Sequence, residues 1–246
     1  MTLLRGIYIA TAQLRAQSFR LETLAANLTQ VETPGYRQDR LTEQTFARLL
    51  LDRIDQGEET VGPLELGPIF SRPTIDLSAG PVEATDRPLD VAILGPGFFV
   101  VQSPAGPRYT RRGTFRQDET GRLVSLEGWP VLGQNGPIAA AGPLRIMSTG
   151  QVLANDQPVG QLQVVTFAEG TTFTRHGGTY LTPEGGAPRP VAAPQLLPGH
   201  VEGSNVDLTT TMTDLIAAAR SYQAAQRALL AHDAILARLI QQAGER

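Results

Sequence analysis

The hydrophobic pattern at both ends of the chain has the period of a helix. Near the N-terminus, apolar and small residues alternate in spacings of three and four, at positions 4, 7, 11, 14, 18, 21, 25 and 28. Near the C-terminus the same alternation runs from position 208 to position 240. Its mean spacing of about 3.5 is that of the heptad repeat. The pattern predicts two long terminal helices that form a coiled-coil-like pair.

Helix-breaking residues are confined to the middle of the chain. Residues 1–33 contain no proline and one glycine, and residues 206–243 contain neither. Thr33-Pro34-Gly35 is expected to end the first helix, because a residue before proline avoids the helical region. Ser204 and Asp207 form a capping signal for the second helix. Between these ends, residues 41–55 are compatible with a further helix, and residues 57–68 have the composition of a loop.

The middle of the chain reads as short strands separated by turns. Two apolar runs, Asp90–Leu94 and Phe98–Gln102, flank a Gly95-Pro96-Gly97 turn, and similar runs follow at short intervals. Such spacing is typical of an antiparallel sandwich or barrel-like domain. The predicted fold class is α+β, with the terminal helices paired and a central antiparallel all-β domain. The expected divisions are an N-terminal helix and turn (1–36), a connector (37–84), the β domain (85–200) and a C-terminal helix (201–246).

Composition narrows the possible partners. The net charge is −3, from 21 basic and 24 acidic residues, which gives no reason to expect nucleic acid or an anionic membrane. The absence of cysteine excludes disulfides and thiolate metal sites. No run of 18 apolar residues exists, so no membrane insertion is expected. The first residues lack the apolar core of a secretory signal, so any export is expected to use no cleaved signal peptide.

No residue pattern points to catalysis. His176, His200 and His232 are far apart and share no metal-ligand spacing. The Gly95-Pro96-Gly97 segment begins like a dinucleotide loop, but Val100 stands where the third glycine belongs and a strand-like segment follows. There is no Gly-x-Ser-x-Gly elbow. We therefore predict no catalytic residue, cofactor, metal or small-molecule substrate.

Three separated segments resemble the flagellar rod and hook protein family. The first is residues 24–37, close to the pattern Asn-Asn-Leu-Ala-Asn-Val-x-Thr-Pro-Gly-Tyr, although Ala26 and Gln30 replace asparagines. The second runs from Arg87 through Val101 to Val124, and the third from Val201 to Leu208. These segments span nearly the whole chain in the family's order. The motif residues that carry the resemblance are Asn27, Pro34, Gly35, Tyr36, Gly97, Phe98, Phe99, Gly203, Ser204 and Asn205.

The resemblance implies a structural subunit of the bacterial flagellar basal-body rod, most like the proximal-rod type, with the distal-rod type second. Terminal helices of such proteins line the inner tube, and the β domain faces outward. The implied partners are other flagellar rod and hook subunits and the flagellar type III export apparatus. The expected location is the rod of the basal body in the cell envelope. The assembly interface is expected at Leu4, Ile7, Leu14, Leu21, Leu28, Val31, Leu208, Met212, Leu215, Tyr222, Leu229, Leu236 and Ile240.

Other interpretations of the sequence remain open at this point. Periodicity alone fits equally well an ordinary two-helix buttress on a β domain. An extracellular adhesive or carbohydrate-binding β domain with helical extensions would need an exposed aromatic platform, and Trp129 is the one tryptophan. An export chaperone would be mostly helical. Within the first motif, Asn27 is expected to bond backbone near the helix end, and Tyr36 to anchor the turn against the C-terminal helix.

Overall fold

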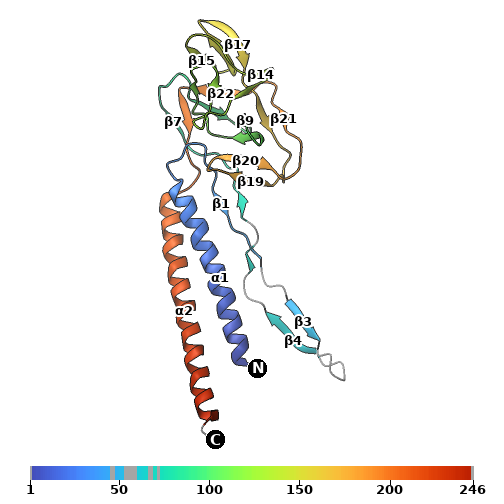
Figure 1. The fold of residues 1–246 in the computed structure, drawn as a ribbon, viewed down its shortest axis with the longest axis vertical. Helices are drawn as coiled ribbons and strands as arrows, with labels where there is room; N and C mark the ends of the chain where they lie inside the picture. The colour runs from blue at the N-terminus through green and yellow to red at the C-terminus, as the bar shows by residue number, and fades with distance from the viewer. Residues whose placement is uncertain (1, 45–47, 53–59, 66–68, 71–72, 245–246) are drawn as a thin grey trace. The chain divides into compact units, whose positions relative to one another are not determined.

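The computed structural model describes residues 2–44, 48–52, 60–65, 69–70 and 73–244 (Figure 1). Side chains are described for residues 9–42, 73–238 and 241–242. The chain divides into two compact units, each built from separated stretches of sequence. The first unit comprises Met1–Leu28, Asp39–Thr74 and Leu208–Arg246, and the second comprises Thr29–Gln38 and Ile75–Asp207. The chain therefore passes between the two units four times, after Leu28, Gln38, Thr74 and Asp207.

The two helices of the described chain lie at its ends, as predicted (Figure 1). Helix α1 (Thr2–Thr29) ends four residues before Thr33, so Val31 lies beyond it and not on its apolar stripe. Helix α2 (Leu208–Gly244) begins directly after Asp207, which therefore takes the N-cap position. The hydroxyl of Ser204 instead accepts a hydrogen bond from the Val206 backbone N–H at 3.2 Å. The predicted stop at Thr33 and the predicted cap at Ser204 thus lie a few residues from the end of α1 and the start of α2.

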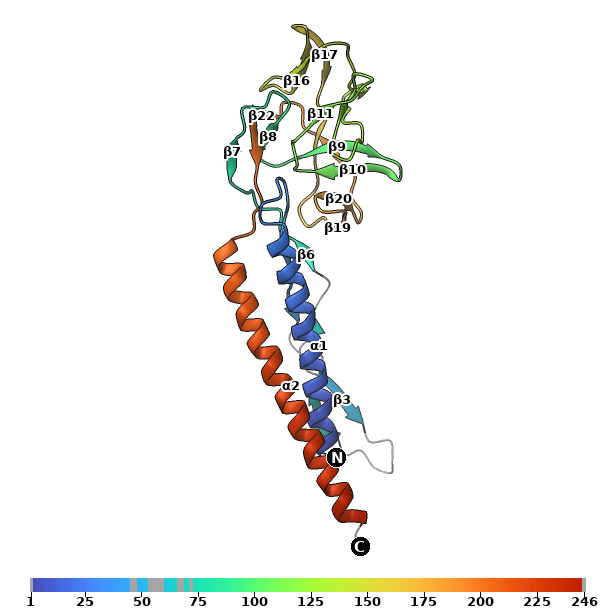
Figure 2. The same cartoon turned by 60° about the vertical axis from the view of Figure 1, so that its left-hand side comes forward.

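The predicted coiled-coil-like pairing is wrong, although the α+β class is correct. A coiled coil requires both sets of alternating positions to insert into the partner helix. In the described residues one of the two sets is mostly exposed on each helix, as at Thr11 and Ala25 of α1. The fully buried residues are mostly small and out of phase with the predicted stripe: Ala10, Ala16, Thr23, Asn27, Thr211, Ala218 and Ala225. Helix α2 is also the longer of the two, with 37 residues against 28 in α1 (Figures 1 and 2).

The stretch between residues 39 and 75 forms short paired strands. The hairpin of β3 (Arg48–Asp52) and β4 (Thr60–Glu65) is antiparallel and places Arg48 opposite Glu65 and Leu49 opposite Leu64. The structure therefore has a hairpin where the sequence predicted a helix across residues 41–55 and a loop across 57–68. The parts of both predictions at 45–47, 53–59 and 66–68 lie outside the described residues. The other pairs are β1 (Asp39–Arg40) with β6 (Thr74–Ile75), and β2 (Glu43–Gln44) with β5 (Ile69–Phe70).

The second unit is an antiparallel β structure, as predicted (Figures 1 and 2). Its largest sheet has the order β19 (Phe173–His176), β20 (Tyr180–Pro183), β10 (Gly106–Thr110), β9 (Phe98–Ser103), β18 (Val164–Thr166) and β21 (Arg189–Pro190). A three-stranded sheet consists of β15 (Leu144–Ile146), β16 (Gln151–Ala154) and β17 (Gln157–Gln161). The two-stranded pairs are β11 (Arg116–Gln117) with β12 (Leu123–Val124), β13 (Leu132–Gly133) with β14 (Gly136–Pro137), β7 (Val82–Ala84) with β23 (His200–Glu202), and β8 (Val91–Leu94) with β22 (Gln195–Pro198).

The core of this unit follows from the alternation of side chains along β9. Phe99 and Val101 belong to one apolar cluster, and Phe98 and Val100 belong to another. Successive residues of a strand point to opposite faces, so β9 is covered on both sides. The ring of Phe99 packs edge-to-face on Phe115, with centroids 5.2 Å apart. Because Phe98 to Val101 all face a core, the first four residues of β9 form a continuous apolar run.

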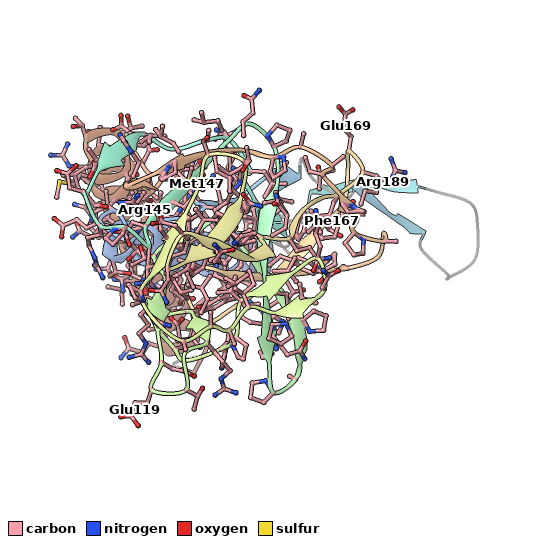
Figure 3. The ribbon with its side chains drawn as sticks, turned by 90° about the horizontal axis from the view of Figure 1, so that it is seen from above. Glu119, Arg145, Met147, Phe167, Glu169 and Arg189 are labelled. Carbon is pink, nitrogen blue, oxygen red and sulfur yellow. The ribbon has the colours of Figure 1, made fainter. Side chains whose placement is uncertain are left out.

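A polar turn between β11 and β12 offers a test of local electrostatics. Asp118 accepts hydrogen bonds from the Thr120 hydroxyl at 2.7 Å and from the Arg122 backbone N–H at 2.8 Å, while Glu119 points away from the domain (Figure 3). Bonding to the Thr120 hydroxyl is the largest cause that lowers the pKa of Asp118 from 3.8 to about 2. The charged carboxylate therefore stabilises the turn above pH 3.8, and this contribution is lost as the pH falls towards 2.

We expect Thr120→Val to raise the pKa of Asp118 towards its ordinary value, because the hydroxyl donor is removed. A carbon-13 NMR titration of the carboxyl group measures the change. Thr171→Val, which removes an exposed hydroxyl elsewhere, serves as the control and should leave the Asp118 pKa unchanged. An unaltered pKa in Thr120→Val would contradict the assignment of that hydrogen bond.

Candidate functional site

The segments that lead out of α1 and into α2 meet inside the second unit. The Gly35 backbone N–H donates to the Glu202 carbonyl at 2.7 Å, and the Asn205 N–H donates to the Tyr36 carbonyl at 3.4 Å. The side-chain oxygen of Asn205 accepts from the Gln38 N–H at 2.7 Å. We call residues 35–38, 76–84, 110–113 and 200–206 the terminal junction. It joins stretches that are more than 160 residues apart in sequence.

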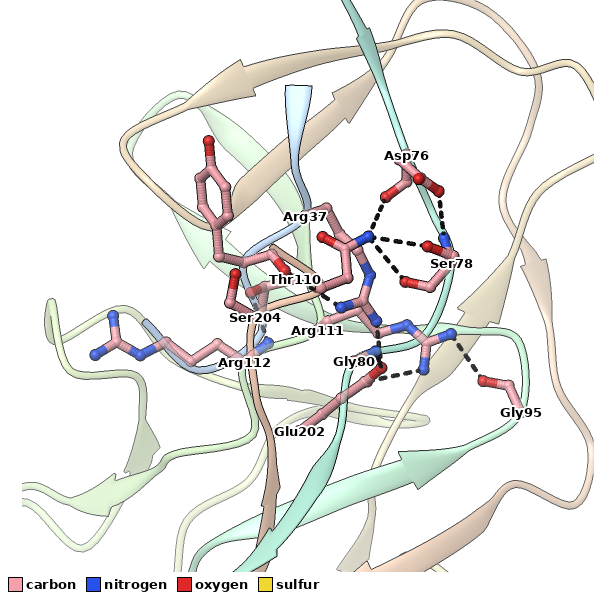
Figure 4. Close-up of polar contacts among 12 residues, drawn as sticks. Arg37, Asp76, Ser78, Gly80, Gly95, Thr110, Arg111, Arg112, Glu202 and Ser204 are labelled. Atoms are coloured by element: carbon pink, nitrogen blue, oxygen red, sulfur yellow. Dashed lines mark hydrogen bonds and ion pairs between the residues drawn. The ribbon is translucent and has the colours of Figure 1, made fainter. Parts of the chain in front are cut away.

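A buried carboxylate lies at the centre of the terminal junction (Figure 4). Glu202 pairs with Arg37 through one oxygen and with Arg111 through the other, at 3.3 Å for the second pair. The Gly80 N–H donates to the same oxygen that Arg37 contacts, at 3.1 Å. The side chains of Arg37 and Glu202 are each 1% exposed. Glu202 thus satisfies donors from three different parts of the chain.

Two guanidinium groups share this one carboxylate, so the cluster has excess positive charge. Burial lowers the pKa of Arg111 to about 10; Glu202 opposes this shift and Arg37 adds to it. Arg111 therefore stays charged at neutral pH. Its other terminal nitrogen donates to the Gly95 carbonyl at 2.7 Å, which ties the group to the turn before β9. Removing the carboxylate would leave two buried cations without an anion, a change that typically costs about 3–5 kcal/mol.

The turn after α1 is held from another side by strand β19. The guanidinium of Arg175 lies 4.4 Å from the centroid of the Tyr36 ring, in a cation–π arrangement. The same side chain donates to the Arg37 carbonyl and, at 2.7 Å, to the Gly178 carbonyl. The side chain of Tyr36 is buried. Tyr36 thus anchors the turn to β19, a partner that the sequence did not indicate.

Glycine is required where backbones of the terminal junction cross closely. Gly35 has a φ of +72°, and a β-carbon there would lie 2.3 Å from the Arg112 backbone nitrogen. A β-carbon on Gly80 would lie 2.4 Å from the Gly203 carbonyl oxygen. Neither contact is possible for a real side chain, because both clashes are with main-chain atoms. The two glycines therefore allow residues 35–38 to lie against residues 110–113, and residues 76–84 to lie against residues 200–206.

Asn27 makes the predicted kind of bond within the first unit. Its side-chain nitrogen donates to the Asp39 carbonyl at 2.8 Å, and its side-chain oxygen accepts from the Asp39 N–H at 2.9 Å. The prediction that this amide bonds backbone near the helix end is confirmed, with the partner ten residues beyond Thr29. Such a two-point contact satisfies both halves of the amide.

The structure gathers some predicted site residues and separates others. Gly35, Tyr36, Gly203, Ser204 and Asn205 lie in the terminal junction, with Pro34 half-buried beside it. The segment Gly97–Phe99 lies in the β core. Among the predicted interface residues, the side chains of Leu4, Ile7 and Ile240 lie outside the described residues, and Leu208 and Met212 are exposed. The remaining ones are half-buried: Leu14, Leu21, Leu28, Val31, Leu215, Tyr222, Leu229 and Leu236.

The charged cluster was missed by the sequence analysis. Arg37, Arg111 and Glu202 each lie inside one of the three segments that carry the family resemblance. The presence of charged residues in all three segments was the available signal. It was overlooked because residues 74 and 91 positions apart show no local spacing that marks them as partners.

Comparison with known proteins decides the identity of the chain. Residues 197–242 match the family model of the flagellar basal body rod FlgEFG protein C-terminal region, and residues 92–154 match the flagellar hook protein FlgE/F/G D1 domain. The basal-body rod protein FlgF of Mesorhizobium japonicum is 32% identical over 225 residues, which cover 89% of each chain. FlgF of Escherichia coli is 35% identical over 81% of this chain and 82% of the relative. The chain belongs to the flagellar basal-body rod protein family.

This rod protein is a structural subunit of the bacterial flagellar basal body, where it assembles with other axial subunits. FlgG of Bacillus subtilis is also similar, at 30% identity over 97% of this chain and 98% of the relative. The family prediction is confirmed, and the FlgF relatives support its proximal-rod type. The adhesive alternative has no support among the relatives. Among the described residues, no helix has both the length and the apolar character needed to cross a bilayer.

Proposed function

We propose that this rod subunit assembles with neighbouring rod and hook subunits through apolar surface on its terminal helices. We also propose that it reaches the rod through the flagellar export apparatus without a cleaved signal peptide, and that it catalyses no reaction. Family membership supports the structural role and the export route. The observation that carries the assembly proposal is a line of exposed large apolar residues on α2.

These residues form one side of the helix. Leu208, Met212 and Ile216 follow one another at intervals of four and are 44%, 46% and 56% exposed. Leu230, at 67%, lies 18 residues after Met212, which is five turns of about 3.6 residues. We call these four residues the apolar face of α2. It is distinct from the side that carries the buried residues Thr211, Ala218 and Ala225.

An apolar helix face of this kind fits another helix as its partner. Apolar side chains grouped on one side of a helix gain stability when a second helix covers them, because water is removed from both surfaces. Subunits that stack around an axis use contacts of this open-ended type. Leu208 and Met212 therefore remain in the proposed interface as exposed positions. The half-buried positions of both helices keep a supporting role in the proposal.

Aspartate on the apolar face should prevent assembly. We expect Met212→Asp with Ile216→Asp to abolish swimming, because two carboxylates would have to be buried against the neighbour. The monomer should keep its helicity and unfolding temperature, since both positions are exposed. Motility in soft agar and the amount of the subunit in purified basal bodies measure the effect in a strain that lacks the wild-type gene.

A matched control places the same charges on another side of α2. Ala217→Asp with Ala224→Asp changes two exposed residues away from the apolar face. We expect this variant to swim and to enter basal bodies at nearly wild-type levels. Normal motility of the Met212 and Ile216 variant, or equal loss in both variants, would contradict the proposed face.

A further inference from the structure

The C-terminal segment of the terminal junction, residues 200–206, lies between residues 76–84 and residues 35–38. On one side, β23 pairs with β7, and the Gly203 N–H donates to the Pro81 carbonyl at 2.7 Å. The side-chain nitrogen of Asn205 donates to the carbonyls of Asp76 and Ser78, at 3.0 and 3.1 Å. On the other side, residues 202–205 receive the turn that follows α1. Residues 200–206 are therefore the middle layer of three.

Three backbone groups of the N-terminal segment bond to this middle layer. The Gly35 N–H, the Tyr36 carbonyl and the Gln38 N–H all bond to Glu202 or Asn205. The bonds that fix the C-terminal segment to residues 76–84 involve no atom of residues 35–38. Residues 35–38 have bonds of their own to Asp76, whose N–H donates to the Gln38 carbonyl at 2.9 Å and whose carboxylate accepts from the Gln38 side chain at 3.1 Å. Residues 200–206 form a complete strand pair with β7, so they can dock on residues 76–84 without residues 35–38.

The buried charge of Arg37 makes this dependence stronger. Its ion-pair partner is Glu202, 165 positions away in sequence, and both side chains are 1% exposed. A guanidinium that enters this site before Glu202 is in place would lose its hydration without gaining an anion, which is strongly unfavourable. Arg111 adds a second positive charge to the same place, at 3.3 Å from Glu202. The site without Glu202 would therefore repel Arg37.

We propose that the terminal junction docks in a fixed order, in which residues 200–206 seat first on the β domain and provide the surface for residues 35–38. Glu202 is the positioning residue of this order. The turn that leads out of α1 acquires its fixed conformation only in a chain whose C-terminal segment has arrived. An incomplete or unfinished chain consequently presents no ordered N-terminal turn. The inference concerns folding of the single chain and stands apart from the proposed apolar face.

Two reciprocal variants of the full-length chain test the order. Gly80→Ala pushes on the Gly203 carbonyl, and the three atoms nearest to a β-carbon at position 80 belong to Gly203 and Ser204. Tyr36→Ala removes the ring beneath Arg175 and loosens the N-terminal segment alone. Amide hydrogen exchange is measured at Gly35, Gln38 and Gly203, with the amides of β9 as the control for a folded core.

The expected result is asymmetric. Gly80→Ala should speed exchange at Gly35, Gln38 and Gly203 by at least about tenfold. Residues 200–206 are loosened directly, and residues 35–38 are loosened because they dock on them. Tyr36→Ala should speed exchange at Gly35 and Gln38 but leave Gly203 within about twofold of wild type. Equal acceleration of Gly203 in both variants would overturn the order. The order would also be overturned if Gly80→Ala sped amide exchange at Gly203 and left exchange at Gly35 and Gln38 unchanged.

A milder pair of variants serves if Gly80→Ala loses the protection of β9. Glu202→Gln keeps the shape of the side chain and removes the anion. It should speed exchange at Gly35 and Gln38 by at least about tenfold, and adding Arg37→Met should restore part of that protection, because the unpaired charge is gone. The absence of any rescue would show that Glu202 does not act through Arg37 and would overturn its positioning role.

Discussion

Gly35→Ala is expected to destabilise the second unit by more than about 3 kcal/mol. A left-handed φ of +72° alone strains an alanine by about 1–2 kcal/mol. In addition, the new β-carbon would lie 2.3 Å from the Arg112 nitrogen and 2.6 Å from the Arg111 carbonyl carbon. Main-chain atoms cannot rotate away, so the turn must move and the contacts of Arg37 with Glu202 must loosen. Chemical denaturation followed by near-ultraviolet circular dichroism measures the loss.

Gly170→Ala separates backbone strain from collision. Gly170 has a φ of +81°, close to that of Gly35, but a β-carbon there would meet no atom within 4 Å. We expect this variant to lose about 1–2 kcal/mol, the cost of the backbone conformation alone. If Gly35→Ala and Gly170→Ala lowered the free energy of unfolding equally, the close approach of Gly35 to the Arg112 backbone would not contribute to the loss of stability.

Phe99→Ala is expected to lower the free energy of unfolding of the second unit by about 3–5 kcal/mol. The side chain is 0% exposed and packs in the main apolar cluster against Phe115. Alanine would leave a cavity in a closed core, with loss of apolar burial and of the edge-to-face contact. Thermal unfolding of the purified chain measures the change. The helical signal of the first unit should change little below the transition.

An exposed phenylalanine provides the matched control for that variant. Phe19 on α1 is 36% exposed, so Phe19→Ala should cost no more than about 1 kcal/mol. The comparison also addresses the role of the Gly97–Phe99 motif. If Phe99→Ala were as mild as Phe19→Ala, the motif would not act through the core, and a contact role for it would have to be considered.

The positions of the terminal helices could be predicted because both ends lack proline and contain almost no glycine. The covered side of α2 could not, and the reason is physical. Large residues such as Met212 dominate a hydrophobic pattern, whereas the covered positions are small, as at Ala218 and Ala225. Periodicity identifies apolar residues and does not tell which of them the chain itself covers. The expected stripe therefore mixed covered positions with exposed ones.

The β domain was predictable in outline because strands such as β9 are continuous apolar runs. The β3–β4 hairpin was not, since its apolar run of Leu49, Leu50 and Leu51 fits a helix as well as a strand. Only the cross-strand partners in β4 distinguish the two. Such pairing depends on residues far along the chain, which local propensity does not include.

The terminal junction was the least predictable part. The family resemblance indicated Gly35, Gly203 and Asn205 but not Gly80. The ion pairs of Glu202 with Arg37 and Arg111 join three segments that only the fold brings together. Charged residues are mostly exposed, so a buried cluster is not the expected state for any of them taken singly. Their burial is explained only by the folded structure, in which Glu202 pairs with both arginines.

Photo-crosslinking within assembled basal bodies tests the central claim most directly. A photoreactive phenylalanine analogue at position 212 lies on the apolar face of α2, and the same group at position 217 lies away from it. Our account predicts that irradiation of purified basal bodies joins the position-212 chain to a neighbouring axial subunit far more efficiently than the position-217 chain. An incorporated subunit that crosslinks to no neighbour from position 212, or equally from both positions, would contradict it.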